Sequence, residues 1–289
     1  MRILIFGGDG MLGHRLLRHF GSRHETRVTL RRPLADYARF GLFTRHNAFD
    51  ETEARDARRV AAVVSAFRPD AVVNAVGIVK QREDAGEADL SNQVNALFPQ
   101  RLATLCRARS ARLVHISTDC VFSGEKGNYA ETDRPDPVDL YGETKLRGEV
   151  SAPGAITLRT SMIGLELARK TGLVEWFLAQ KGKKIRGYRK AIFSGFITAE
   201  LARLIEKLLI RYPDAHGLYH ASSDPISKFD LLASLESRLG LGVTIVPDET
   251  VTCDRSLDSA PFRRDFDYAP PSWDAMLDEL AAEIQKGTA

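Results

Sequence analysis

Short apolar runs alternate with stretches of helical periodicity along the first 160 positions of the chain. The apolar runs predict strands at residues 2–6, 26–30, 71–77, 113–116 and 155–159, with a further short strand before residues 48–50. Helical spacing of apolar residues predicts helices at about 12–20, 52–67, 90–107 and 141–151. This alternation is typical of a parallel, doubly wound sheet with helices on both faces, so we predict an α/β fold of the Rossmann class.

The pattern loosens after residue 161. Helices are predicted at 173–180, 199–209, 229–239 and 272–284, without repeats or low-complexity linkers between them. We therefore expect two domains, a Rossmann domain over residues 1–161 and a smaller α/β ligand-binding lobe over residues 162–289. We leave open that some segments of the lobe return to the Rossmann domain.

The strand ends carry candidate ligand residues, because ligands of parallel α/β sheets bind at the carboxyl ends of the strands. The first strand runs into Gly7, Gly10 and Gly13, spaced G-x-x-G-x-x-G before a helix, as a dinucleotide site requires. Glycines let the backbone approach a pyrophosphate, and the helix N-terminus attracts its negative charge. A tight strand–helix turn without a ligand would use the same residues.

The second strand ends in Arg31-Arg32, at the position where NAD enzymes usually carry an acidic residue for the ribose 2′-hydroxyl. Two guanidinium groups suit a 2′-phosphate instead, so we predict NADPH (NADP) as the cofactor. The alternative is a solvated basic turn.

Tyr141 and Lys145 lie four residues apart on a predicted helix, a spacing that places both side chains on one helix face. An ammonium group beside a phenol lowers the pKa of the phenol from about 10 toward working pH. Such a tyrosine can exchange a proton with an oxygen of a bound substrate. The spacing also arises by chance, so this candidate depends on the strand-end residues around it.

The amino-acid composition and charge are those of a globular protein and give no sign of a nucleic acid, membrane or metal partner. Hydrophobic residues make up 44% and charged residues 27%, as in a typical globular protein, and the net charge of +3 is too small to indicate nucleic acid binding. No apolar run reaches membrane-spanning length or looks like a signal peptide, so we expect no membrane partner. Cys106, Cys120 and Cys253 are widely spaced, which favours a reducing cytoplasm. The seven histidines show no ligand spacing, so no metal site is predicted.

Five segments of the chain resemble one enzyme family. They are Gly7-x-x-Gly10-x-x-Gly13, RPDAVVNA at 68–75, STDCVFSG at 117–124, YGETKLRGE at 141–149 and LRTS at 158–161. The chain is similar to the extended short-chain dehydrogenase/reductase superfamily, and most to its dTDP-4-dehydrorhamnose reductase-like branch of nucleotide-sugar reductases. The matching segments cover the predicted Rossmann domain in the right order, whereas the lobe is similar only in length and character.

This resemblance implies hydride transfer between NADPH and the 4-keto group of a nucleotide-linked 6-deoxysugar, in the cytoplasmic synthesis of cell-surface polysaccharide precursors. Tyr141 would be the acid that protonates the alkoxide, and Lys145 would lower its pKa and hold the nicotinamide ribose. Thr118, with Ser117, would polarise the carbonyl group. The residues assigned to the cofactor are Gly7, Asp9, Gly10, Met11, Leu12, Gly13, Arg31, Arg32, Phe49, Asp50, Asn74, Ala75, Val76, Gly77, Asn95, Tyr141, Lys145, Thr160 and Ser161.

The implied substrate, a nucleotide-diphosphate sugar, needs cations for its diphosphate and an apolar or aromatic slot for its base. Basic residues cluster between positions 181 and 190, although a solvated basic loop would look the same. The residues assigned to the substrate are Val79, Cys120, Trp176, Lys183, Lys184, Arg186, Lys190 and Phe193. Cys120 follows Asp119 where related 4,6-dehydratases carry an Asp-Glu pair, so dehydration is disfavoured.

Two other functions stay open. An epimerase that works by transient oxidation would usually keep an acidic NAD selector where Arg31-Arg32 stands. A non-catalytic NADP-binding regulatory subunit, like that of methionine adenosyltransferase, resembles the same branch and could retain Tyr141 and Lys145. The sequence does not decide the sugar, the nucleotide or the oligomeric state, and a homodimer is left open.

Overall fold

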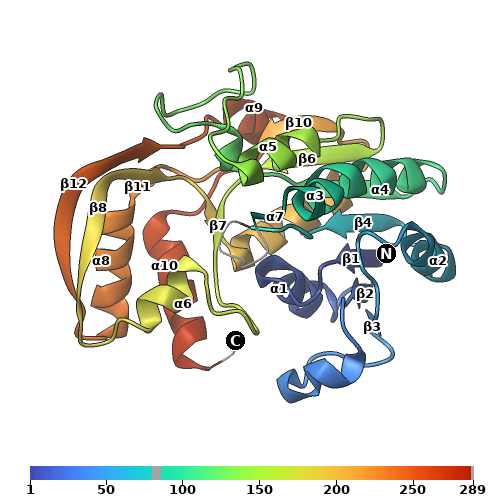
Figure 1. Cartoon of the computed structure of the whole chain (residues 1–289), viewed down its shortest axis with the longest axis horizontal. Coiled ribbons are helices and arrows are strands. Elements are labelled where there is room, and N and C mark those ends of the chain that lie inside the picture. The colour runs from blue at the N-terminus through green and yellow to red at the C-terminus, as the bar shows by residue number, and fades with distance from the viewer. Residues whose placement is uncertain (80–85, 288–289) are drawn as a thin grey trace. The chain divides into compact units, whose positions relative to one another are not determined.

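The computed structural model describes residues 1–79 and 86–287 of the chain (Figure 1). Contacts between Cα atoms divide the chain into two compact units, each assembled from separate segments. The first unit comprises Met1–Ser117, Asp139–Leu158 and Ala202–Leu218. The second unit comprises Thr118–Val138, Arg159–Leu201 and Tyr219–Ala289. The single domain boundary expected at residue 161 stays a prediction.

A seven-stranded sheet forms the centre of the first unit, with the strand order β10-β6-β5-β4-β1-β2-β3. Its strands are β1 (Arg2–Phe6), β2 (Glu25–Thr29), β3 (Ala48–Phe49), β4 (Ala71–Asn74), β5 (Arg112–Ile116), β6 (Ala155–Arg159) and β10 (Gly217–His220). The neighbouring strands from β3 to β6 all pair in parallel. The strand order reverses between β1 and β4, neighbours in Figure 1, where open parallel sheets form their ligand crevice.

Helices cover this sheet because alternate strand residues point to opposite faces. The helical segments are α1 (Met11–Phe20), η1 (Leu34–Phe40), α2 (Ala57–Phe67), α3 (Ala88–Ser91), η3 (Asn92–Leu97), α4 (Phe98–Arg107), α5 (Leu140–Arg147) and the part of α7 (Thr198–Arg211) from Ala202 onward. On one face, Leu4 and Phe6 of β1 pack in one buried cluster with α2 and α4. Ile3 and Ile5 alternate with them and are also fully buried, toward the other face. The predicted parallel α/β fold of the Rossmann class is confirmed.

Several elements of the first unit have other bounds than the sequence predicted, and β4 and α5 end earlier, at Asn74 and Arg147. The third strand occupies Ala48–Phe49 itself and not the residues before it. The helix expected from residue 52 begins at Ala57, because the Asp56 carboxylate accepts the Arg59 N–H at 2.9 Å and caps the helix there.

The second unit contains two small sheets. In the larger one β8 (Lys184–Phe193) pairs in parallel with β12 (Thr244–Asp254) and antiparallel with β11 (Ile226–Ser227). In the smaller one β7 (Met162–Ile163) pairs with β9 (Phe196–Ile197). Its helices are η4 (Asp119–Val121), α6 (Leu173–Leu178), α8 (Lys228–Leu239), α9 (Ala260–Asp265) and α10 (Trp273–Gln285). No helix within residues 1–79 and 86–287 is both long and apolar enough to cross a membrane.

Candidate functional site

The glycine turn between β1 and α1 is held against the neighbouring strand β2. Gly7 and Gly8 donate their N–H groups to the Thr29 hydroxyl at 3.2 Å and the Thr29 carbonyl at 2.9 Å. Gly7 adopts a φ of 89°, which few residues with a side chain tolerate. A Cβ at Gly13 would overlap the carbonyl group of Gly7, so only glycine lets α1 begin this close to the turn. The result is a glycine-rich cradle at a helix N-terminus, which fits a pyrophosphate.

The basic pair after β2 lies beside this turn. Arg31 and Arg32 are both exposed. The Tyr37 hydroxyl accepts the Arg32 N–H at 3.3 Å and donates to Asp9 Oδ2 in the glycine turn at 3.2 Å. The carboxylate of Asp50 accepts the Leu34 N–H at 2.8 Å and so fixes the start of η1. The predicted cofactor residues Asp9 and Arg32 are thus connected through Tyr37, a residue to which the sequence pattern assigned no role.

The end of β4 is shaped by a buried pair of side chains. Asn74 is fully buried, accepts the Val76 N–H at 3.1 Å and places its amide nitrogen 3.1 Å from Nδ1 of His115 on β5. Burial, with a smaller effect of the Lys145 charge, holds the pKa of His115 well below its usual value, so this imidazole is neutral. The Asn74–His115 pair therefore fixes the turn Ala75–Gly77, where we placed part of the cofactor.

Asn95 joins that turn to the helix of the candidate catalytic residues. Its amide accepts the Ile78 N–H at 2.8 Å, and donates to the Ile78 carbonyl at 3.0 Å and the Thr144 hydroxyl at 3.1 Å. These bonds occupy both ends of a fully buried amide. Asn95 lies in η3, a π-helical turn inside the helix that we predicted at 90–107, and such turns often occur at functional sites. Val79 is half-buried and follows this bonded Ile78.

Tyr141 and Lys145 lie one turn apart on α5. Asp139 caps this helix by accepting the Gly142 N–H at 2.8 Å. Tyr141 is half-buried, whereas Lys145 is 3% exposed and donates from Nζ to the Ile116 carbonyl at the end of β5 at 2.5 Å. Burial lowers the pKa of Lys145 to about 8, against the opposing effect of the Glu149 charge. An ammonium group is therefore held beside the end of β5, at the C-terminal edge of the sheet.

The serine and threonine after β5 make different contacts. Ser117 donates its hydroxyl to Glu149 Oε1 at 2.8 Å. Thr118, in the second unit, accepts the Cys120 N–H and donates to Asp119 Oδ1, both at 3.1 Å. Glu149 is thus a candidate positioning residue, although the family motif that contains it gave it no role.

Cys120 and the segment after β6 belong to the second unit. Arg255 donates from Nη1 to the Cys120 sulfur at 3.3 Å, a partner that no sequence motif indicated. Thr160 accepts the Asp119 N–H on its carbonyl oxygen at 3.3 Å, and Ser161 accepts the Phe196 N–H at 3.0 Å. Through these bonds Cys120, Thr160 and Ser161 contact other residues of the second unit. Their roles in binding the substrate or the cofactor stay predictions.

Acidic side chains accompany the predicted substrate-binding cluster on β8. Arg186 pairs with Asp248 at 3.4 Å and Lys190 with Glu249 at 3.2 Å. Sequence reasoning missed both acids, because the parallel pairing of β8 with β12 joins positions about 60 residues apart. Lys183 and Lys184 are exposed, as is Trp176 at 40%, whereas Phe193 is buried and contacts the Trp273 ring with 5.5 Å between centroids. The cluster is partly neutralised, and its role stays a prediction.

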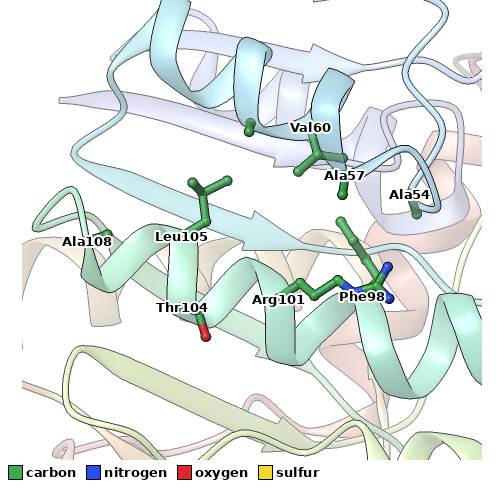
Figure 2. Close-up of a pocket in the computed structure, with 9 residues that line it drawn as sticks. Ala54, Ala57, Val60, Phe98, Arg101, Thr104, Leu105 and Ala108 are labelled. Carbon is green, nitrogen blue, oxygen red and sulfur yellow. The ribbon is translucent and has the colours of Figure 1, made fainter.

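An apolar cavity of about 390 Å³ lies between α2 and α4 of the first unit (Figure 2). None of its lining residues was assigned to the cofactor or the substrate. They are Ala54, Ala57, Val60, Ala61, Phe98, Arg101, Thr104, Leu105 and Ala108. In the part of the chain that the structure describes, no group of three or more His, Cys, Asp or Glu side chains could hold a metal ion.

Comparison with known proteins gives matches that cover between about half of the chain and almost all of it. The model of the family described as RmlD substrate binding domain matches residues 1–285. The dTDP-4-dehydrorhamnose reductase of Salmonella typhimurium is 25% identical, over 98% of this chain and 98% of that protein. Methionine adenosyltransferase 2 subunit beta of Bos taurus is 30% identical, over 58% of this chain and 48% of that protein. The structure of a dTDP-4-dehydrorhamnose reductase from Bacillus anthracis in complex with NADP shares the fold, with a TM-score of 0.80, 22% identity, and coverage of 98% of this chain and 99% of that one.

Proposed function

The chain belongs to the RmlD substrate binding domain family, and from this premise we propose that it is an NADPH-dependent reductase of the 4-keto group of a nucleotide-linked 6-deoxysugar. Membership agrees with the resemblance to the dTDP-4-dehydrorhamnose reductase-like branch, and a relative that matches over almost its whole length carries that enzyme's name. One observation carries the proposal beyond the family. Lys145 is buried on α5, one turn after Tyr141, with its ammonium group bound at the end of β5.

The chemistry follows from what a ketone needs on reduction. NADPH, when bound, supplies the hydride. The carbonyl oxygen gains negative charge, so a proton donor and fixed hydrogen-bond donors near it stabilise the transition state. Tyr141 gives the proton, and the Lys145 ammonium favours the phenolate that is left behind. The hydroxyl groups of Ser117 and Thr118 are the candidate donors that polarise the carbonyl.

The first unit fits a dinucleotide with a 2′-phosphate. The glycine turn presents backbone N–H groups and a helix N-terminus with no acidic residue in its first turn, which favours a pyrophosphate. The exposed guanidinium groups of Arg31 and Arg32 follow the neighbouring strand and supply positive charge for the phosphate. The nucleotide-sugar substrate is assigned to the second unit. A cytoplasmic location and a homodimer stay predictions.

Replacement of Tyr141 by phenylalanine tests this function. The proton donor is lost while the ring remains, so turnover should fall at least about 100-fold. The assay follows NADPH absorbance with a panel of nucleotide 4-ketosugars made in place by dehydratases. NADPH affinity, measured by fluorescence titration, should stay within a few-fold of wild type. Tyr212→Phe, at the end of α7, serves as the matched control and should keep full activity.

Wild-type turnover in Tyr141→Phe would contradict the acid assignment. No NADPH oxidation by the wild-type protein with any 4-ketosugar, together with co-purification of a larger partner protein, would select the second candidate. That candidate is a non-catalytic NADP-binding subunit. The similarity to methionine adenosyltransferase 2 subunit beta, which extends over 58% of this chain, favours it.

A further inference from the structure

Tyr37 occupies a buried position between two loops of the first unit. It lies on η1, is only 6% exposed, and packs edge-on against Phe43 with 5.6 Å between ring centroids. A ring packed in this way can hold its hydroxyl group at a fixed point. Neither the sequence motifs nor the proposed mechanism assigns Tyr37 a role.

The hydroxyl group of Tyr37 connects the glycine turn to the basic pair. It donates to Oδ2 of Asp9, two residues after Gly7, at 3.2 Å. It accepts the backbone N–H of Arg32, which follows β2, at 3.3 Å. The two loops follow the adjacent parallel strands β1 and β2, so this one hydroxyl joins the pyrophosphate cradle to the candidate 2′-phosphate site.

The protonation state of Tyr37 suits this role. Burial, with a further effect of the Asp9 charge, raises the pKa of Tyr37 to about 12, while the Arg31 charge opposes the rise. The phenol therefore stays protonated at neutral pH and can donate to a carboxylate. A donor to an ionised acceptor makes a stronger hydrogen bond than a neutral pair.

The charge of Asp9 disfavours a 2′-phosphate, and the hydrogen bond from Tyr37 counteracts this effect. A carboxylate in this turn would repel a 2′-phosphate held by the neighbouring basic pair, and it would accept a hydrogen bond from the 2′-hydroxyl of NAD. Arg31 and Arg32 favour the opposite choice. We propose that Tyr37 determines cofactor choice, by engaging the Asp9 carboxylate and fixing Arg32 so that the basic pair, and not the carboxylate, meets the 2′ position. This role rests on the proposed use of NADPH.

The test is a set of binding titrations with NADPH and NADH on the purified protein, without substrate. Tyr37→Phe keeps the ring and removes the hydroxyl group, so Asp9 is released toward the ribose. The dissociation constant for NADPH should rise about ten-fold, whereas that for NADH should change less than about two-fold. Adding Asp9→Asn to Tyr37→Phe removes the released charge and should restore NADPH affinity to within about three-fold of wild type.

The outcomes separate this role from a merely structural one and from the function on which it rests. Equal losses for both cofactors that Asp9→Asn does not rescue would overturn the proposal, because a packing defect has that signature. If Tyr37→Phe kept the wild-type preference for NADPH over NADH, the proposed role of Tyr37 would be overturned, and the proposed function would stand. Wild-type protein that binds NADH as tightly as NADPH would instead overturn the use of NADPH in the proposed function, and this role with it.

Discussion

Lys145 combines deep burial with a charge that the proposed chemistry needs. The residue is 3% exposed, its ammonium group donates to the Ile116 carbonyl, and burial lowers its pKa to about 8. The group is therefore mostly protonated at pH 7 and mostly neutral at pH 9. An ordinary lysine on the surface would keep its charge through this whole range. The charge of the proposed site is thus sensitive to mildly alkaline conditions.

We predict that NADPH binding weakens as pH rises through 8. The charged fraction of Lys145 falls about ten-fold between pH 7 and pH 9, so the dissociation constant should rise by about the same factor if the cation contacts the cofactor. Fluorescence titration of NADPH at several pH values measures this dependence. Lys145→Met should bind weakly at every pH, with a flat profile. An equally steep profile in that variant would show that another group titrates.

At the scale of elements, α5 packs against the π-helical segment η3 with almost no space between their backbones. A Cβ at Gly148, which follows α5, would overlap the carbonyl oxygen of Asn95 and lie 3.2 Å from Cα of Ala96. The same contact region contains the hydrogen bond from Asn95 to Thr144. Only glycine permits this approach, because backbone atoms cannot move aside as a flexible side chain can.

Gly148→Ala should therefore lower the free energy of unfolding by about 1–3 kcal/mol, as overpacking of a buried contact does. Chemical denaturation measured by circular dichroism gives this value. The matched control is Gly86→Ala, since Gly86 has nothing within 4 Å of the added Cβ and should lose far less. Equal stability of the two variants would mean that the helices separate at little cost.

Sequence patterns predicted the elements whose signals are local. The apolar runs at β1, β4, β5 and β6 and the glycine turn depend on neighbouring residues, and the structure contains each of them. The π-helical turn was missed because no local pattern marks it, and the bond from its Asn95 to Thr144 joins positions 49 residues apart. The roles of Tyr37 and of Glu249 beside Lys190 were missed for the same reason, since only tertiary pairing brings these groups to their partners.

At the scale of the whole molecule, the chain enters the first unit three times, and its last entry supplies contacts from α7 and part of an edge strand. Glu206 on α7 accepts hydrogen bonds from His19 at 2.8 Å, Arg23 at 2.6 Å and His24 at 3.2 Å. The Arg112 guanidinium donates to the α7 carbonyl of Leu209 at 2.7 Å. Residues 202–218 also bring the first part of β10 to the edge of the sheet.

We predict that a fragment of residues 1–161 does not fold by itself. It would leave the half-buried imidazole groups of His19 and His24 and the half-buried guanidinium group of Arg112 without their α7 partners, and it would expose apolar surface that α7 covers. Thermal unfolding followed by circular dichroism should show no cooperative transition for the fragment, in contrast to the full chain. A cooperative transition with NADPH binding would establish residues 1–161 as an independent domain.

The return of residues 202–218 to the first unit also bears on synthesis in the cell. Nascent domains generally fold as units while the ribosome extends the chain. This sheet cannot gain its last strand or the α7 contacts until position 218 has left the exit tunnel. At typical elongation rates of about 5–20 residues per second, its apolar face waits several seconds for that cover. The nascent chain is therefore a candidate client for chaperones that shield such surfaces.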